Sequence, residues 1–144
     1  MQPKIAIIGA GPAGLMAAQV LAEAGYPPVV FDAMPSAARK FLQAGRGGLN
    51  LTHGEDFEVF KGRYFEAQNF LTPALEKFTP TDLRKWAESF GFETFIGSSG
   101  KVYPLDKKAA PLLRTWLHQL KSQHTVFHMK HRWLGWQASA NGQV

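Results

Sequence analysis

Short apolar runs and a helix-forming segment alternate over the first thirty-two residues. Residues 4–8 form a β-branched run that ends at Gly9, which predicts a buried strand. Residues 13–24 are rich in helix formers and stop at Gly25, a residue type that commonly caps a helix C-terminus. Residues 27–32 predict a second short strand. This order predicts a βαβ unit with parallel strands and a right-handed crossover.

Residues 55–90 have a helical pattern that is rich in aromatic side chains. In its last part Thr79 is the predicted N-cap, Pro80 takes the first helical position, and Gly91 closes the helix. Its apolar residues follow the i, i+3, i+4, i+7 spacing of a buried stripe: Leu83, Trp86, Ala87 and Phe90. We therefore expect these aromatic side chains in the core.

The last third of the chain returns to strands. Residues 93–104 predict two short strands around a Gly-Ser-Ser-Gly turn. Residues 107–121 predict a helix in which Pro111 can kink the first turn. One face of this helix is apolar: Leu113, Trp116, Leu117 and Leu120. Residues 125–129 predict a strand that returns to the sheet.

The final residues predict an interrupted hairpin. Residues 133–144 form an extended segment that contains Asn141-Gly142, a strong hairpin signal. Because only two residues follow this turn, the partner strand is missing, and we expect the chain to be the N-terminal part of a larger domain. We expect three segments: a βαβ unit with a second glycine-rich loop (1–54), a helical and hairpin insertion (55–105), and a helix, a returning strand and the start of a truncated β-meander (106–144).

Composition narrows the possible classes. Of 144 residues, 45% are hydrophobic and 19% are charged, as in a soluble globular protein. No apolar stretch reaches the ~20 residues that span a bilayer, so we expect no membrane partner. The chain has no cysteine, which excludes disulfides and thiolate chemistry and fits the expected cytoplasmic location. The apolar N-terminus faintly resembles a secretory signal, but four residues interrupt it: Gly9, Gly11, Pro12 and Gly14.

The net charge of +5 favours a phosphate-bearing ligand. The basic residues are scattered, without an RNA-binding signature or a basic helix, so we expect no nucleic-acid partner.

The first glycine motif predicts dinucleotide binding. Gly9-x-Gly11-x-x-Gly14 follows a strand and opens a helix, and Asp32 ends the next strand 18 residues after Gly14. In this motif the first glycine permits a tight turn, the second admits a pyrophosphate, and the third packs the helix on the strand. The helix N-terminus attracts phosphate, and Asp32 accepts hydrogen bonds from ribose hydroxyls while repelling a 2′-phosphate.

A second glycine-rich segment, "RKFLQAGRGGLN" at residues 39–50, favours FAD over NAD. Its glycines allow close approach of the backbone to a ligand, and Arg46 offers a planar, charged donor to a phosphate. FAD is long, and a second loop suits its flavin half. A surface loop with Arg46 in solvent is the alternative reading.

Five stretches and Asp32 together resemble the BaiN-like bacterial flavoproteins, a family of NAD(P)/FAD-dependent oxidoreductases that includes aminoacetone-oxidase-like enzymes. They are "IGAGPAGLMAA" with Asp32, "ARKFLQAGRGGLNLTH", "GFETFIGSSGKVYP", "KAAPLLRTWL" and "HRWLGW". The resemblance implies an α/β Rossmann-like, two-dinucleotide-fold flavoprotein, with FAD as cofactor and NAD(P)H as electron donor. It implies that the first glycine motif holds the pyrophosphate, that Asp32 holds the ribose, and that the second segment lines the pyrophosphate and flavin. By analogy the backbone near Trp133 contacts adenine.

The expected cofactor-binding residues come from both glycine segments and the ends of two strands. They are Gly9, Ala10, Gly11, Pro12, Ala13, Gly14, Asp32, Ala33, Arg39, Lys40, Gly45, Arg46, Gly47, Gly48, Leu49, Asn50, Thr52 and Trp133. The family commonly reads Ser-Gly-Gly-Gly-Arg-Cys-Asn where this chain has residues 44–50, which moves the arginine two places earlier and replaces the cysteine by Leu49. Asp32 stands where glutamate is commoner, which shortens its reach.

The histidines offer weaker signals. His124, His128 and His131 fall on a predicted strand and turn without a nearby carboxylate or thiolate, so we expect no metal. His53 either donates a proton near the ring or orients the loop. No catalytic residue, substrate or oligomeric state can be assigned from the sequence, and two alternatives stay open: an NAD-dependent dehydrogenase fragment, and a nucleotide-binding module without catalysis.

Overall fold

A computed structural model describes residues 4–136. The chain divides into two compact units, a first unit of residues 1–40 and 117–144 and a second unit of residues 41–116. The predicted hairpin at Asn141-Gly142 lies outside the described residues. Within residues 4–136 no helix has the length and apolarity required to span a bilayer.

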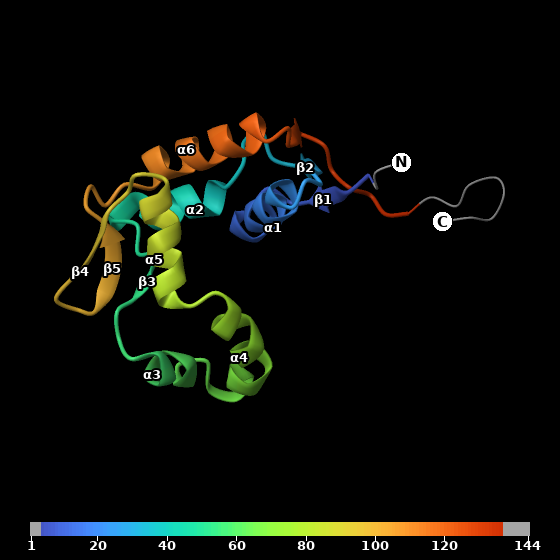
Figure 1. The fold of residues 1–144 in the computed structure, drawn as a ribbon. Coiled ribbons are helices and arrows are strands. Elements are labelled where there is room, and N and C mark those ends of the chain that lie inside the picture. Colours follow the sequence, from blue (N-terminus) through green and yellow to red (C-terminus); the bar gives the residue numbers. More distant parts are fainter. Residues whose placement is uncertain (1–3, 137–144) are drawn as a thin grey trace. The chain divides into compact units, whose positions relative to one another are not determined.

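The first unit contains a parallel three-stranded sheet in the order β1-β2-β6. The strands are β1 (Ala6–Ile8), β2 (Val29–Asp32) and β6 (Val126–Met129), and the helix α1 (Pro12–Glu23) links β1 to β2 (Figure 1). The register places Val29 opposite both Ala6 and Val126. This arrangement confirms the predicted βαβ unit and the returning strand.

Small and branched side chains form the core of this unit. Leu15 and Ala18 of α1 and Val30 at the centre of the sheet are completely buried. Alanine at position 18 allows the helix to lie close to the strands, because a methyl group fills little space. Gly25 has a φ of +84° and ends α1, as the sequence predicts.

The second unit is helical with a small antiparallel sheet in the order β3-β5-β4. Its strands are β3 (Thr52–His53), β4 (Thr94–Ile96) and β5 (Lys101–Pro104). Its helices are α3 (Phe57–Gly62), the 3₁₀ turn η2 (Phe65–Ala67), α4 (Gln68–Lys77) and α5 (Pro80–Ser89). The helical pattern predicted over residues 55–90 and the predicted hairpin over residues 93–104 are both present.

The start of α5 follows its sequence signal. Thr79 Oγ1 accepts the Asp82 N–H (3.2 Å), and the Asp82 carboxylate accepts the Thr79 N–H (3.0 Å), which forms a reciprocal capping box. The hydrogen bond from the Thr79 hydroxyl, together with that backbone bond, holds the pKa of Asp82 below its usual value. Gly91 adopts a φ of +84° and donates its N–H to the Glu88 carbonyl (2.8 Å), so the helix closes there as predicted.

The predicted stripe of α5 meets the predicted stripe of the last helix, α6 (Ala109–Ser122). The rings of Trp86 and Trp116 pack edge to face with centroids 4.8 Å apart, and Trp116 is nearly fully buried. Leu112 beside it is completely buried. The prediction of a buried aromatic stripe is therefore confirmed for Trp86 and Trp116, whereas Phe90 is only half-buried.

Two predictions about these elements need correction. The second glycine-rich segment is not a loop throughout, because α2 (Arg39–Ala44) and a 3₁₀ turn, η1 (Gly45–Gly47), occupy most of it. Five of its first six residues, all except Phe41, are good helix formers, and the helix stops at the glycines after them. Helix α6 begins at Ala109 and not at residue 107, so Pro111 lies at its third position, where it removes no helical hydrogen bond.

Candidate functional site

The structure explains the glycine at each position of the first motif in a different way. Gly9 adopts a φ of +106°, and its N–H donates to the Phe31 carbonyl (2.7 Å), so the chain turns sharply at the end of β1. At Gly14 a β-carbon would overlap the Gly9 carbonyl oxygen and lie 3.4 Å from Ile7 Cγ2. The fold therefore requires glycine at both positions.

Gly11 differs from both of them. It is the N-cap of α1 with φ −78° and ψ 178°, a conformation open to any residue. A β-carbon built there meets nothing within 4 Å. Neither backbone strain nor packing accounts for a glycine at this position; glycine is a favoured N-cap residue, and it leaves the space in front of the backbone open to a ligand.

The first turn of α1 offers free amides at the same place. The Leu15 N–H already bonds to the Gly11 carbonyl (2.9 Å), and Pro12 has no N–H. The amides of Ala13 and Gly14 precede the first helical hydrogen bond and carry the positive end of the helix dipole. Among the described residues α1 has no acidic side chain in its first turn and no side-chain cap to take them.

Asp32 is tied to this loop through its carboxylate. Oδ2 accepts the N–H of Ala10 (2.7 Å), and Oδ1 accepts the N–H of Met34 (2.7 Å). These two bonds fix the orientation of the carboxylate at the C-terminal end of β2. Because an ionised carboxylate has about four acceptor positions, two remain for a ligand.

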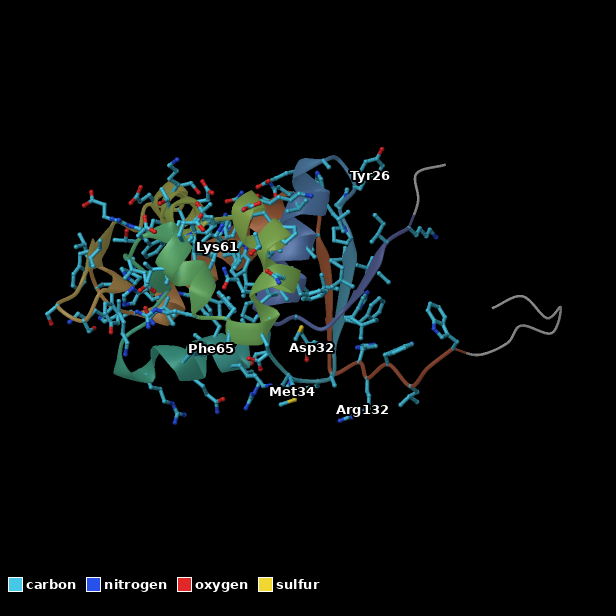
Figure 2. The ribbon with its side chains drawn as sticks, turned by 90° about the horizontal axis from the view of Figure 1, so that it is seen from below. Tyr26, Asp32, Met34, Lys61, Phe65 and Arg132 are labelled. Carbon is cyan, nitrogen blue, oxygen red and sulfur yellow. The ribbon has the colours of Figure 1, made fainter. Side chains whose placement is uncertain are left out.

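The segment after β6 completes a hollow beside Asp32. Lys130 N–H donates to the Met34 carbonyl (3.0 Å) and His131 N–H to the Asp32 carbonyl (2.9 Å), so the chain crosses the end of β2. A cavity of about 260 Å³ lies there, lined by Ile8, Gly9, Phe31, Asp32, Ala33, His131, Arg132 and Trp133. Figure 2 shows Asp32, Met34 and Arg132 at this end of the sheet. The structure thus brings Gly9, Asp32, Ala33 and Trp133 of the predicted site together.

A larger and mainly apolar hollow of about 560 Å³ continues along the sheet, with Ala6, Ile8, Phe31, Trp133 and Trp136 among its lining residues. Sequence reasoning missed Arg132 and His131, which line both hollows. The sequence does contain a signal for these two residues. The carboxyl ends of parallel strands lie at the same edge of a sheet, where ligands bind, and both residues closely follow such a strand. His128 stacks on Phe31, with ring centroids 5.1 Å apart.

Residues 41–50 of the second glycine segment belong to the second unit. Arg46 lies exposed in η1, whereas Leu49 is buried. The Leu49 N–H donates to the Lys107 carbonyl (2.9 Å). Gly48 has a φ of +110°, and a β-carbon at Gly45 would overlap Ala109 Cβ, so these two glycines are required by the fold. At Gly47 a β-carbon meets nothing within 4 Å, which leaves this position open to a ligand.

Arg39 and Lys40 begin α2, Asn50 follows the buried Leu49, and Thr52 begins β3. Arg39 and Lys40 belong to the first unit, whereas Asn50 and Thr52 belong to the second.

His53 is held by its neighbours at the end of this segment. Its Nε2 lies 3.1 Å from the Ser99 carbonyl oxygen, and its Nδ1 lies 3.3 Å from Glu55 Oε1. Glu55 makes a bidentate ion pair with Arg63, and this pair holds the pKa of Glu55 below its usual value. These contacts orient the His53 ring toward the Gly97–Gly100 turn.

Comparison with known proteins places this geometry in a family. Residues 3–144 match the family model described as the HI0933-like protein Rossmann domain. The chain therefore belongs to the HI0933-like Rossmann-domain family, and the predicted Rossmann-like α/β fold is confirmed. The narrower BaiN-like assignment stays a prediction.

Solved structures share the fold. The chain is similar to THI4 of Thermovibrio ammonificans, with a TM-score of 0.52 and 20% identity over 88% of this chain and 38% of that one. It is also similar to the open conformation of a flavocytochrome c3 fumarate reductase, with a TM-score of 0.51 and 15% identity over 88% of this chain and 26% of that one.

A curated relative is closer in sequence over a shorter stretch. The ribosomal RNA dihydrouridine synthase of Haemophilus influenzae is 39% identical over 77 residues, which are 53% of this chain and 18% of that enzyme. The matched stretch therefore spans about a fifth of that relative.

Proposed function

We propose that this chain binds FAD and forms the cofactor-binding part of a flavin-dependent oxidoreductase. The observation that carries the proposal is Gly11, because its backbone conformation and its surroundings accept a side chain, and the absence of one leaves the first amides of α1 open to a ligand. The fixed carboxylate of Asp32, bonded to the same loop through Ala10, supports it. Membership in the HI0933-like Rossmann-domain family supports it independently.

Each part of the cofactor has residues that fit it. The amides at the start of α1 suit the pyrophosphate, and the two open acceptor positions of Asp32 suit ribose hydroxyls. The hollow beside Trp133 offers aromatic surface to adenine, with Arg132 on the same wall. The second glycine segment, with Arg46 and the open position at Gly47, suits the flavin half. When bound, the isoalloxazine supplies the hydride chemistry.

Charge supports a phosphate-bearing ligand in the first unit. Its only acidic residues are Glu23 and Asp32, whereas its basic residues are Lys4, Arg39, Lys40, Lys121, Lys130 and Arg132. This excess of positive charge attracts an anionic dinucleotide and compensates for the one carboxylate within the site.

The proposal also includes NAD(P)H as the electron donor, a small-molecule substrate and a cytoplasmic location. The BaiN-like assignment rests on the second glycine segment. An NAD-dependent dehydrogenase and a non-catalytic nucleotide-binding module are the alternative outcomes.

Reduction of uridine in ribosomal RNA is a second candidate activity. It is favoured by the 39% identity to the dihydrouridine synthase and by the net charge of +5. It conflicts with the expectation of no nucleic-acid partner, so the two candidates make opposite predictions about RNA.

The test begins with the bound cofactor. The protein is purified and denatured, and the released chromophore is identified by chromatography and fluorescence. FAD supports the proposal, whereas NAD or no dinucleotide contradicts it. Anaerobic addition of NADH or NADPH then bleaches the flavin absorbance near 450 nm if the donor is assigned correctly, a wavelength that is roughly where oxidised flavins absorb.

The RNA candidate is tested separately. Cells that lack the gene are compared with cells that carry it for dihydrouridine in ribosomal RNA, measured by mass spectrometry of nucleosides. Equal dihydrouridine content in both strains rejects this candidate and leaves FAD binding unaffected.

A further inference from the structure

Lys107 has an unusual place beside the second glycine segment. It lies between β5 and α6 with a φ of +55°, which is uncommon for a residue with a side chain. Its carbonyl accepts the Leu49 N–H (2.9 Å), and its own N–H donates to the Pro104 carbonyl (2.9 Å). The sequence predicts Lys107 as the start of a helix, but the structure places it before α6, where its carbonyl supports Leu49.

The backbone of Gly48 lies directly against this lysine. The position of a β-carbon on Gly48 is 3.7 Å from Lys107 Cβ and 3.6 Å from Tyr103 Cε1. The glycine segment, the Lys107 side chain and the Tyr103 ring therefore form one contiguous surface within the second unit.

Two aromatic rings hold the ammonium group of Lys107. Its Nζ lies 5.5 Å from the centroid of Phe95 and 5.8 Å from the centroid of Tyr103, both within the range of a cation–π contact. The two rings lie 5.9 Å apart at 31° to one another on paired residues of β4 and β5. A lysine side chain normally samples many rotamers, so this clamp, formed by the rings of Phe95 and Tyr103, restricts the position of the ammonium group.

The charge of Lys107 is not neutralised by a carboxylate. Within residues 4–136 it takes part in no ion pair, and its neighbour Asp106 accepts the backbone N–H of Lys108 (3.0 Å). The residue is also exposed, so its N–H groups are open to a ligand. A fixed, unpaired and accessible cation beside a glycine-rich surface is suited to an anionic partner.

We propose that Lys107 supplies the positive charge that faces the flavin half of FAD and so favours the reduced flavin. This inference rests on the proposed FAD binding by the second glycine segment. Two-electron reduction adds electrons to the isoalloxazine, and a nearby cation stabilises the extra negative charge more than it stabilises the neutral oxidised ring. Lys107 would thus act on the affinity for one redox state and not on FAD binding in general.

The test is the two-electron midpoint potential of the bound flavin in Lys107→Gln. We expect reduced FAD to lose about tenfold more affinity than oxidised FAD, which lowers the potential by about 30 mV. Lys107→Arg keeps the charge and the cation–π contacts and should retain most of the wild-type potential. Lys108→Gln is the matched control, since this neighbouring lysine is also exposed and has no ring contact among the described interactions; its potential should equal that of wild type.

Three results would overturn the inference. The first is an unchanged potential in Lys107→Gln at equal flavin occupancy. The second is equal weakening of both redox states, which indicates a contact with the phosphates, whose charge does not change on reduction. The third is an equal fall of potential in Lys108→Gln, which indicates a non-specific charge effect.

A further variant covers the case in which Lys107→Gln does not fold. Phe95→Leu keeps the lysine and removes one ring of the clamp, so the potential should fall in the same direction by a smaller amount, and an unchanged potential contradicts the inference. If wild-type protein binds no FAD, the proposed function fails together with this inference. If it binds FAD with a potential insensitive to Lys107, only this inference fails.

Discussion

Replacing Gly11 should separate ligand binding from folding. A valine side chain at this position meets no atom of the protein within 4 Å of its β-carbon, and the φ and ψ of Gly11 suit any residue. Gly11→Val should therefore lower stability by only about 1 kcal/mol or less, the cost of a poorer N-cap. Its branched side chain fills the space in front of the first helical amides, where the pyrophosphate is expected.

The loss of binding follows from the hydrogen bonds that the valine prevents. One bond from an amide to a charged phosphate oxygen contributes about 1.5–3 kcal/mol. Losing one such bond raises the Kd for FAD or ADP by about 10- to 150-fold. Isothermal titration calorimetry measures this change, and urea unfolding of the same samples measures stability.

Gly14→Ala is the matched comparison within the same motif. Its β-carbon would overlap the Gly9 carbonyl oxygen and lie 3.1 Å from the Gly9 carbonyl carbon, so α1 must move away from β1. Overpacking of this kind typically costs about 1–3 kcal/mol. Gly11→Val should lose binding and keep stability, whereas Gly14→Ala should lose stability. Wild-type affinity in Gly11→Val, or equal destabilisation by both changes, would refute the reasoning.

Three further changes probe other contacts. Asp32→Ala should weaken ADP binding by about 1.5–3 kcal/mol in calorimetry, and it leaves the buried Ala10 amide without its acceptor; unchanged affinity would show that the carboxylate serves only the fold. Thr79→Ala should lower the free energy of unfolding by about 1 kcal/mol in urea titrations, because the capping box is lost, and an unchanged midpoint would contradict that role. Arg63 lowers the pKa of Glu55 in the folded protein. The ion pair therefore stabilises the fold fully above pH 4.5, and this stabilisation is lost as the pH falls through the folded-state pKa. Glu55→Gln should therefore show a shallower loss of thermal stability below about pH 4.5, and an identical acid profile would exclude this ion pair as a cause.

Local sequence signals predicted helices and strands wherever a capping residue or a regular spacing of apolar residues was present. Gly25 and Gly91 end their helices with positive φ, and Thr79 begins α5 with a complete capping box. These contacts span only a few residues, so the sequence contains all the information they need. The second glycine segment was predicted to be a loop because its glycines were given more weight than the helix-forming residues that precede them.

Local sequence signals do not predict contacts between residues of different strands and helices. Arg132 lines the hollow beside Asp32 because β6 lies parallel to β2 and the chain then turns across the strand ends. The ring contacts of Lys107 were not predicted, because its partners, Phe95 and Tyr103, come from a hairpin whose register brings their rings together. Arg132 depends on strand pairing over a long sequence separation, and Lys107 depends on the register of a hairpin.

The sequence by itself determined the βαβ unit, the helix ends and the glycine motif with its acidic residue, because each depends on residue types at fixed short spacings. Only the tertiary structure distinguished the glycine that the fold does not need, Gly11, from those that it does, Gly9 and Gly14. That distinction depends on which atoms surround each backbone position, and spacing along the chain does not specify the distance to atoms of other elements.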